Sequence, residues 1–149
     1  MRLARTALVA MLSLVALSLP AANAVVGKWK TDGGKSLVEI TATPEGGLSG
    51  RIVWLKEPLY MDAKQGPVGS AKVDRHNQDV TLRGKPLLGL RILEGFVVAA
   101  EGLWEKGTIY DPENGKTYKC RMKLTAPDRL EVRGYIGISL IGRTTVWTR

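Results

Sequence analysis

The sequence predicts an all-β domain of eight short antiparallel strands, folded as a closed barrel or as a sandwich. Three observations predict this class. Runs of alternating apolar and polar residues recur at roughly ten-residue spacing, turn-forming Gly, Pro, Asn and Asp separate them, and little of the chain has a helical period. Because neighbouring side chains of a strand lie on opposite faces, each run has one apolar and one polar, often cationic, face.

The first 24 residues are expected to be a secretory signal peptide. Arg2 and Arg5 supply a positive start, residues 7–19 an apolar stretch, and Ala22-Asn23-Ala24 a cleavage site of small residues. This stretch is shorter than the roughly 20 residues that span a bilayer, and no transmembrane span is expected in the mature chain. We therefore expect cleavage after Ala24 and a periplasmic or secreted protein.

Residues 25–149 have the length of one domain. The whole chain has 22 basic and 14 acidic side chains; without Arg2 and Arg5 the count is 20 against 14, or +6. The basic residues are spread along many strands, which predicts a solvated surface and no nucleic-acid site. Such a surface can still attract anionic partners. Cys120 is the single cysteine, so no internal disulfide can form, and its apolar-face position predicts an inert thiol.

Each expected strand follows from its alternation or its flanking turns. In the clearest run, Tyr118 and Met122 lie on the face opposite Lys119 and Lys123. The eight expected strands are Gly27–Lys30, Ser36–Thr43, Leu48–Leu55, Leu90–Ala99, Leu103–Tyr110, Thr117–Leu124, Leu130–Ile136 and Gly142–Thr148. Between the third and the fourth, residues 56–89 form one long loop without sustained periodicity. Ordered loops of this length are uncommon and are often functional lids, so we expect this one to cover a barrel mouth.

Several short motifs stand in the same order as in a known family. They are Gly27-x-Trp29, Gly50-Arg51-Ile52-Val53-Trp54, Asp74-x-x-Asn77, Pro86-Leu87-Leu88-Gly89, Gly107-x-Ile109-Tyr110-Asp111-Pro112, Gly115-Lys116-Thr117-Tyr118, Arg133-Gly134-Tyr135-Ile136-Gly137 and Gly142-Arg143-Thr144 through Trp147-Thr148-Arg149. Over essentially all of the mature chain, the sequence resembles the bacterial secreted family called domain of unknown function 2147. It departs at Lys85, where the family pattern often has Arg.

The resemblance implies a lipocalin-like fold, an eight-stranded up-and-down barrel that can hold a small-molecule cavity. The family has no established activity, so the resemblance implies no catalytic residue. Gly27-x-Trp29 also resembles the lipocalin opening motif, in which the Trp closes one barrel end beneath an Arg of the last strand. Arg149 or Arg143 is the candidate for that Arg.

The residues themselves give no catalytic or metal-binding set. His76 is the single histidine, which excludes most catalytic triads and zinc sites. Asp74, Asn77 and Asp79 could offer oxygen ligands, but turn hydrogen bonds explain them better, and Asp111 likewise begins a turn. We therefore expect no catalytic residue, no metal, no cofactor and no enzyme activity.

The interior is the remaining candidate site. The leading hypothesis is an exported lipocalin-like protein that binds a small apolar or amphipathic ligand inside the barrel. Apolar-face residues would contact it, with Tyr118 as a polar member: Ile40, Ile52, Trp54, Tyr118, Met122 and Val132. An eight-stranded barrel is just wide enough either to hold one small ligand or to fill itself. The alternative is thus a filled barrel, a structural or interaction protein whose basic surface binds anionic components of the cell envelope.

Overall fold

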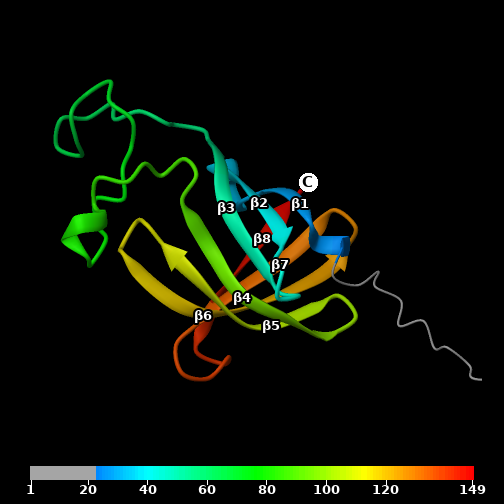
Figure 1. Ribbon diagram of the computed structural model, residues 1–149. Helices are drawn as coiled ribbons and strands as arrows, with labels where there is room; N and C mark the ends of the chain where they lie inside the picture. Colours follow the sequence, from blue (N-terminus) through cyan, green and yellow to red (C-terminus); the bar gives the residue numbers. More distant parts are fainter. Residues whose placement is uncertain (1–22) are drawn as a thin grey trace, which may run out of the picture.

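The computed structural model describes residues 23–149, so all but the last two residues of the predicted signal peptide lie outside the described residues. The strands are β1 (Gly27–Lys30), β2 (Ser36–Ala42), β3 (Leu48–Leu55), β4 (Arg91–Ala100), β5 (Leu103–Asp111), β6 (Lys116–Ala126), β7 (Arg129–Tyr135) and β8 (Gly142–Thr148). Each pairs antiparallel with the next, and β8 pairs with β1 to close a barrel (Figure 1). The predicted eight-stranded up-and-down barrel is confirmed.

Helix is confined to three short 3-10 segments within residues 23–149: Asn23–Val25, Asp32–Gly34 and Val80–Leu82. None of these is long and apolar enough to cross a membrane. The last lies in the long connection between β3 and β4, residues 56–90. In Figure 1 much of this connection extends outward from one end of the barrel.

The barrel interior is one apolar cluster to which every strand contributes. Four large aromatic side chains belong to it, as inward positions of an eight-stranded barrel need bulk to fill the space. Trp29, Phe96 and Trp104 are fully buried, and Trp147 is nearly so. Close packing of this kind is a main source of stability in a domain of this size.

One end of the barrel is plugged by contacts between the two ends of the described chain. The indole Nε1 of Trp29 donates to the carbonyl oxygen of Val25 at 2.7 Å. The Arg149 guanidinium lies 4.3 Å from the centroid of the Trp29 ring and donates to the carbonyl oxygens of Val26 and Pro127. A cation over an indole face is attracted to the electron-rich ring. Of the two candidate arginines, Arg149 therefore closes this end.

A bulge in β3 places one predicted interior residue on the outer surface. Leu37 of β2 pairs with Trp54, whereas the next residue, Val38, pairs with Ile52. The extra residue, Val53, reverses the alternation, because an inserted residue shifts all later side chains to the other face. Trp54 is 44% exposed, so its expected interior position is wrong.

The other end of the barrel is formed by four connections. Since strands alternate in direction, the β1–β2, β3–β4, β5–β6 and β7–β8 connections all lie at the end opposite the Trp29 plug. Lys35 of the first connection forms an exposed ion pair with Glu113 of the third. This open end holds the candidate site.

Candidate functional site at the open end of the barrel

The open end contains a pocket of about 710 Å³. Its walls come from the end of β5, the start of β6, the turn between them, the long connection and the start of the β7–β8 loop. The lining residues are Asn77, Gln78, Asp79, Tyr110, Gly115, Lys116, Thr117, Tyr118 and Ile136. Two tyrosine rings and an isoleucine beside amides, hydroxyls, one carboxylate and one lysine make a surface suited to an amphipathic molecule.

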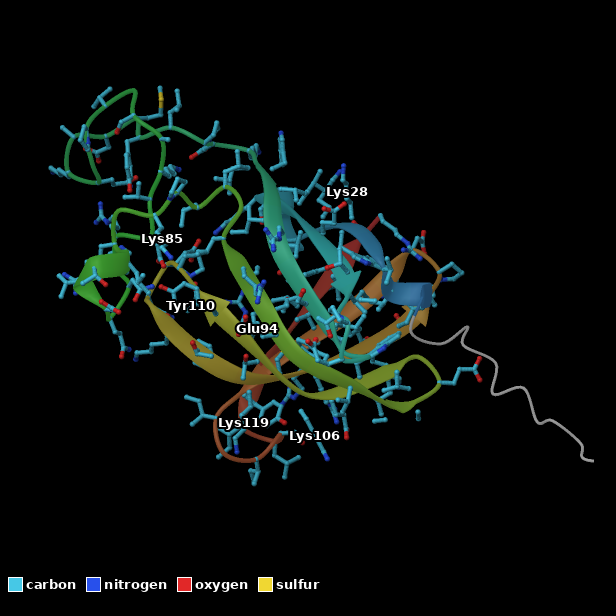
Figure 2. The ribbon with its side chains drawn as sticks, in the orientation of Figure 1. Lys28, Lys85, Glu94, Lys106, Tyr110 and Lys119 are labelled. Atoms are coloured by element: carbon cyan, nitrogen blue, oxygen red, sulfur yellow. The ribbon has the colours of Figure 1, made fainter. Side chains whose placement is uncertain are left out.

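A buried carboxylate fixes one wall of the pocket. Asp74, only 1% exposed, accepts 2.7 Å hydrogen bonds from the Tyr110 hydroxyl at Oδ1 and from Asn77 Nδ2 at Oδ2. Partial burial raises the pKa of Tyr110 well above its ordinary value, and its bond to the Asp74 carboxylate adds to the rise. Tyr110 therefore stays a neutral donor at physiological pH and ties β5 to the long connection. Figure 2 labels Tyr110 at this end of the barrel.

A glycine lets the long connection approach the β5–β6 turn. Gly115 has φ = 71°, and a Cβ at this position would overlap the carbonyl oxygen of His76. Only glycine fits such a conformation and such an approach without strain. Asp111 caps the same turn by accepting from the backbone N–H of Glu113 and from Asn114 Nδ2, each at 2.9 Å. The turn role predicted for Asp111 is thus confirmed.

Tyr118 faces the interior side of β6 at the pocket. It shares its face with buried Cys120, and it pairs across the sheet with Ile109, which packs against the core. Its hydroxyl accepts a 3.0 Å hydrogen bond from Asn114 Nδ2. The ring is half-buried, so it adds apolar surface to a lining whose other members are mostly polar.

Residues 27–149 match the family described as "Uncharacterized protein conserved in bacteria (DUF2147)". The chain belongs to the DUF2147 family. Among solved structures, it is similar to one titled "Protein HP1028 from the human pathogen Helicobacter pylori belongs to the lipocalin family", with a TM-score of 0.69 and 22% identity. That similarity covers 83% of this chain and 81% of the other, and it supports the lipocalin-like fold. Comparison with curated protein sequences gave no significant match.

Four predicted ligand contacts of this DUF2147 protein lie inside the barrel. Ile40, Ile52, Met122 and Val132 are buried members of the central cluster, and their contact with a ligand stays a prediction. Tyr118 lies at the pocket, and Trp54 lies outside. The alternation of the strands located the interior residues, but it did not associate Tyr110 with Asp74, which lies 36 positions earlier in the chain. No pattern within a short stretch of the sequence predicts a hydrogen bond between residues so far apart.

The side chains considered for catalysis have ordinary surroundings in this DUF2147 protein. Within residues 23–149, no three His, Cys, Asp or Glu side chains gather as a metal site. His76 is exposed, and its Nε2 accepts from Arg75 Nε at 3.1 Å. Asp79 caps the Val80–Leu82 helix through Thr81, and these bonds lower the pKa of its carboxyl. Burial raises the pKa of the Cys120 thiol to about 12, which leaves it protonated and inert.

Proposed function

We propose that this protein is a non-enzymatic, exported binding protein that holds a small apolar or amphipathic ligand at the open end of its barrel. One observation carries the proposal: the two ends of the barrel differ. The Trp29–Arg149 contact plugs one end, whereas the pocket of about 710 Å³ lies at the other. The lipocalin-like fold supports it further, since barrel mouths commonly hold small ligands.

The pocket suggests how such a ligand lies. Its apolar part would contact the rings of Tyr118 and Tyr110 and the side chain of Ile136. Its polar part would meet the rim, where Lys116 forms no salt bridge with any described residue. The Asp79 carboxylate is already engaged, because its Oδ1 accepts from the backbone N–H and the hydroxyl of Thr81. Asp79 keeps its negative charge in these bonds, so the Lys116 ammonium is the group of the rim that would meet a carboxylate or another anionic end, placed away from Asp79.

Three of the predicted ligand contacts are buried in the interior cluster and do not line the pocket. Ile52 and Val132 are nearly fully buried, and Met122 is fully buried beside Trp104. An apolar tail that reached them would need the side chains of the cluster to move. We therefore place the ligand mainly in the pocket and keep deeper contacts as the second part of the proposal.

Binding can be measured with cis-parinaric acid, a fluorescent fatty acid with one carboxylate. We expect saturable binding at one site and at least about a tenfold weaker affinity for Tyr118→Ala, since the lost ring removes apolar contact area. Tyr135→Ala is the matched control, because Tyr135 ends the neighbouring strand β7 and pairs with Lys119, whose side chain lies on the outer face. Equal affinity of both variants, or no saturable binding, would overturn the proposal.

Export and a native ligand can be tested together by mass spectrometry. The full-length chain is expressed in a bacterium with an intact envelope and purified from the periplasm. We expect an intact mass that begins at Val25 and, under native conditions, a bound adduct that denaturation releases. Recovery of the chain only from the cytoplasm, with a mass that begins at Met1, would contradict export, and an adduct-free native mass from every preparation would contradict an endogenous ligand.

A second candidate function is favoured by the packing of the plugged half. Trp29, Trp104 and Trp147 fill that half, as expected for a barrel with a structural or interaction role. In this alternative, the basic surface binds anionic components of the envelope. Release from envelope fragments by salt alone, together with no binding of cis-parinaric acid, would favour it.

A further inference from the structure

The β7–β8 loop, residues 136–141, displays an unusual set of exposed apolar side chains. Ile136, Ile138, Leu140 and Ile141 are 66%, 60%, 84% and 66% exposed. Four large exposed aliphatic side chains thus lie within six residues, whereas single exposed apolar residues are normal on protein surfaces. In Figure 1 the loop projects by itself from the barrel, apart from the long connection.

The loop is held in this shape by the chain around it. The backbone N–H of Ile136 donates to the carbonyl oxygen of Ile141 at 3.1 Å. Arg133 donates from Nε to the carbonyl oxygen of Ser139 at 2.7 Å and from Nη2 to that of Leu140. Lys119 Nζ reaches the carbonyl oxygen of Gly137 at 3.4 Å. Side chains of β6 and β7 thus bind the backbone of the loop, and its aliphatic side chains are left pointing to solvent.

The surroundings of the loop are cationic. Lys119 of β6 contacts the loop, Arg143 follows it at the start of β8, and Arg121 of β6 pairs with Arg133, which binds the loop; Figure 2 shows Lys119 beside it. From residue 132 to residue 149 the sequence has no Asp or Glu. The three flanking cations form no salt bridge with any of residues 23–149. A local excess of positive charge therefore surrounds the apolar tip.

We propose that the β7–β8 loop docks the protein on an anionic phospholipid bilayer. The four aliphatic side chains enter the boundary between headgroups and acyl chains, and Lys119, Arg121 and Arg143 contact lipid phosphates. Apolar groups at a tip with cations around them match the layered chemistry of a lipid surface. A stable protein interface uses roughly 800 Å², or about 20–30 residues, on each partner. A tip of six residues is much smaller, which favours a bilayer over a protein as the binding partner.

Docking in this way would bring the mouth pocket close to the bilayer. Ile136 belongs both to the loop and to the pocket wall, so the two sites share a boundary. The docking inference does not require the pocket to bind a ligand. Vesicle binding and cis-parinaric acid binding can therefore succeed or fail separately.

Co-sedimentation with vesicles tests the docking. The probes are vesicles of equal parts phosphatidylglycerol and phosphatidylcholine, and vesicles of phosphatidylcholine alone. We expect partitioning onto the anionic vesicles to exceed that onto the neutral ones at least about tenfold and to fall as salt rises. The double variant Leu140→Ser and Ile141→Ser should lower it by about tenfold or more, because two apolar groups are removed from the contact.

Two matched controls isolate the loop. Val68→Ser with Val80→Ser removes two exposed apolar side chains from the long connection, and Lys56→Gln with Lys64→Gln removes two exposed cations there. Both controls should bind anionic vesicles within about twofold of the unchanged protein, whereas Lys119→Gln with Arg143→Gln should bind several-fold more weakly. All substituted side chains are exposed, and unchanged melting temperatures would show that the variants fold.

Insertion of the loop can be observed directly. Cys120 is fully buried, so the thiol of a Leu140→Cys variant can be labelled selectively with an environment-sensitive NBD dye. Anionic vesicles should shift its emission to the blue, and the same dye at Val80→Cys should not respond. No sedimentation of the unchanged protein, equal binding of the Leu140→Ser/Ile141→Ser variant, or equal dye responses would overturn the proposal.

Discussion

A single hydrogen bond contributes most to stability where it satisfies a buried charge. Among the described residues, Asp74 is the buried charged side chain. Its two carboxylate oxygens accept from Tyr110 and Asn77, so removal of either donor leaves a charge with too few partners. The sequence predicted Asp74 and Asn77 as turn residues. This is correct for Asn77, whose Oδ1 accepts a turn hydrogen bond from the backbone N–H of Asp79. The sequence did not predict the burial of Asp74, because that burial depends on Tyr110, which belongs to a strand far along the chain.

Changing Tyr110 to Phe should lower the free energy of unfolding by about 1–3 kcal/mol, because a buried carboxylate loses one of its hydrogen-bond donors. Tyr118→Phe is the matched control, since the hydroxyl it removes meets only the exposed Asn114. We expect a loss of less than about 1 kcal/mol there. Urea unfolding at neutral pH measures both, and equal losses would contradict a special role of the Asp74 contact.

The stability difference between the unchanged protein and Tyr110→Phe should depend on pH. The pKa of Tyr110 is raised on folding, so its contribution is fully present below its ordinary value of 10.0. As the pH rises above 10, the unfolded chain ionises first and the contribution is progressively lost toward the higher pKa of the folded state. The stability difference between the unchanged protein and Tyr110→Phe should therefore narrow from pH 9 to pH 11. A constant difference would show that the raised pKa is absent.

At the scale of the element, alternation predicted the strands but not their bulges. All eight predicted strands exist, because the side-chain period of two is a local property that each run displays by itself. A bulge depends on how two strands pair, and nothing within residues 48–55 shows that Val53 is the extra residue. For this reason the sequence predicted Ile52 correctly as an interior residue and Trp54 incorrectly.

Because of the bulge, truncation of Ile52 and truncation of Trp54 should change the free energy of unfolding by different amounts. Ile52→Ala should cost about 2–4 kcal/mol, because it opens a cavity in the packed interior, whereas Trp54→Ala should cost less than about 1 kcal/mol. Chemical denaturation followed by circular dichroism provides the comparison. If the larger, aromatic residue proved the more costly to remove, the assignment of Trp54 to the outer face would be incorrect.

For the whole molecule, the weakest part of the barrel is its closing seam. β1 and β8 share a single registered pair, Lys30 with Thr148, while β7 and β8 share seven. Arg149 reinforces this seam by binding the carbonyl oxygens of Val26 and Pro127 and by covering Trp29. The resemblance to lipocalins named Arg149 and Arg143 as candidates for this role, and only the folded arrangement distinguished them.

Arg149→Ala should destabilise the protein by about 1–3 kcal/mol through the lost cation–π contact and hydrogen bonds. Hydrogen exchange should accelerate first in β1 and β8, because opening at the seam breaks the fewest strand pairs. Arg143→Ala is the control, since Arg143 belongs to the same strand but lies toward the open end. Uniform acceleration across all strands in Arg149→Ala would argue against a local opening at the seam.

The sequence by itself determined the strands, the turns between them, the apolar interior and the family resemblance, because alternation and turn chemistry are encoded within short stretches. Only the tertiary structure decided which side chains meet: Arg149 with Trp29, Tyr110 with Asp74, and Gly115 with the backbone of His76. It also showed that the β7–β8 loop leaves its aliphatic side chains exposed. The physical reason is that the alternation of faces along a strand is a local property, whereas a bulge, a contact or the burial of a side chain depends on other strands distant in the sequence.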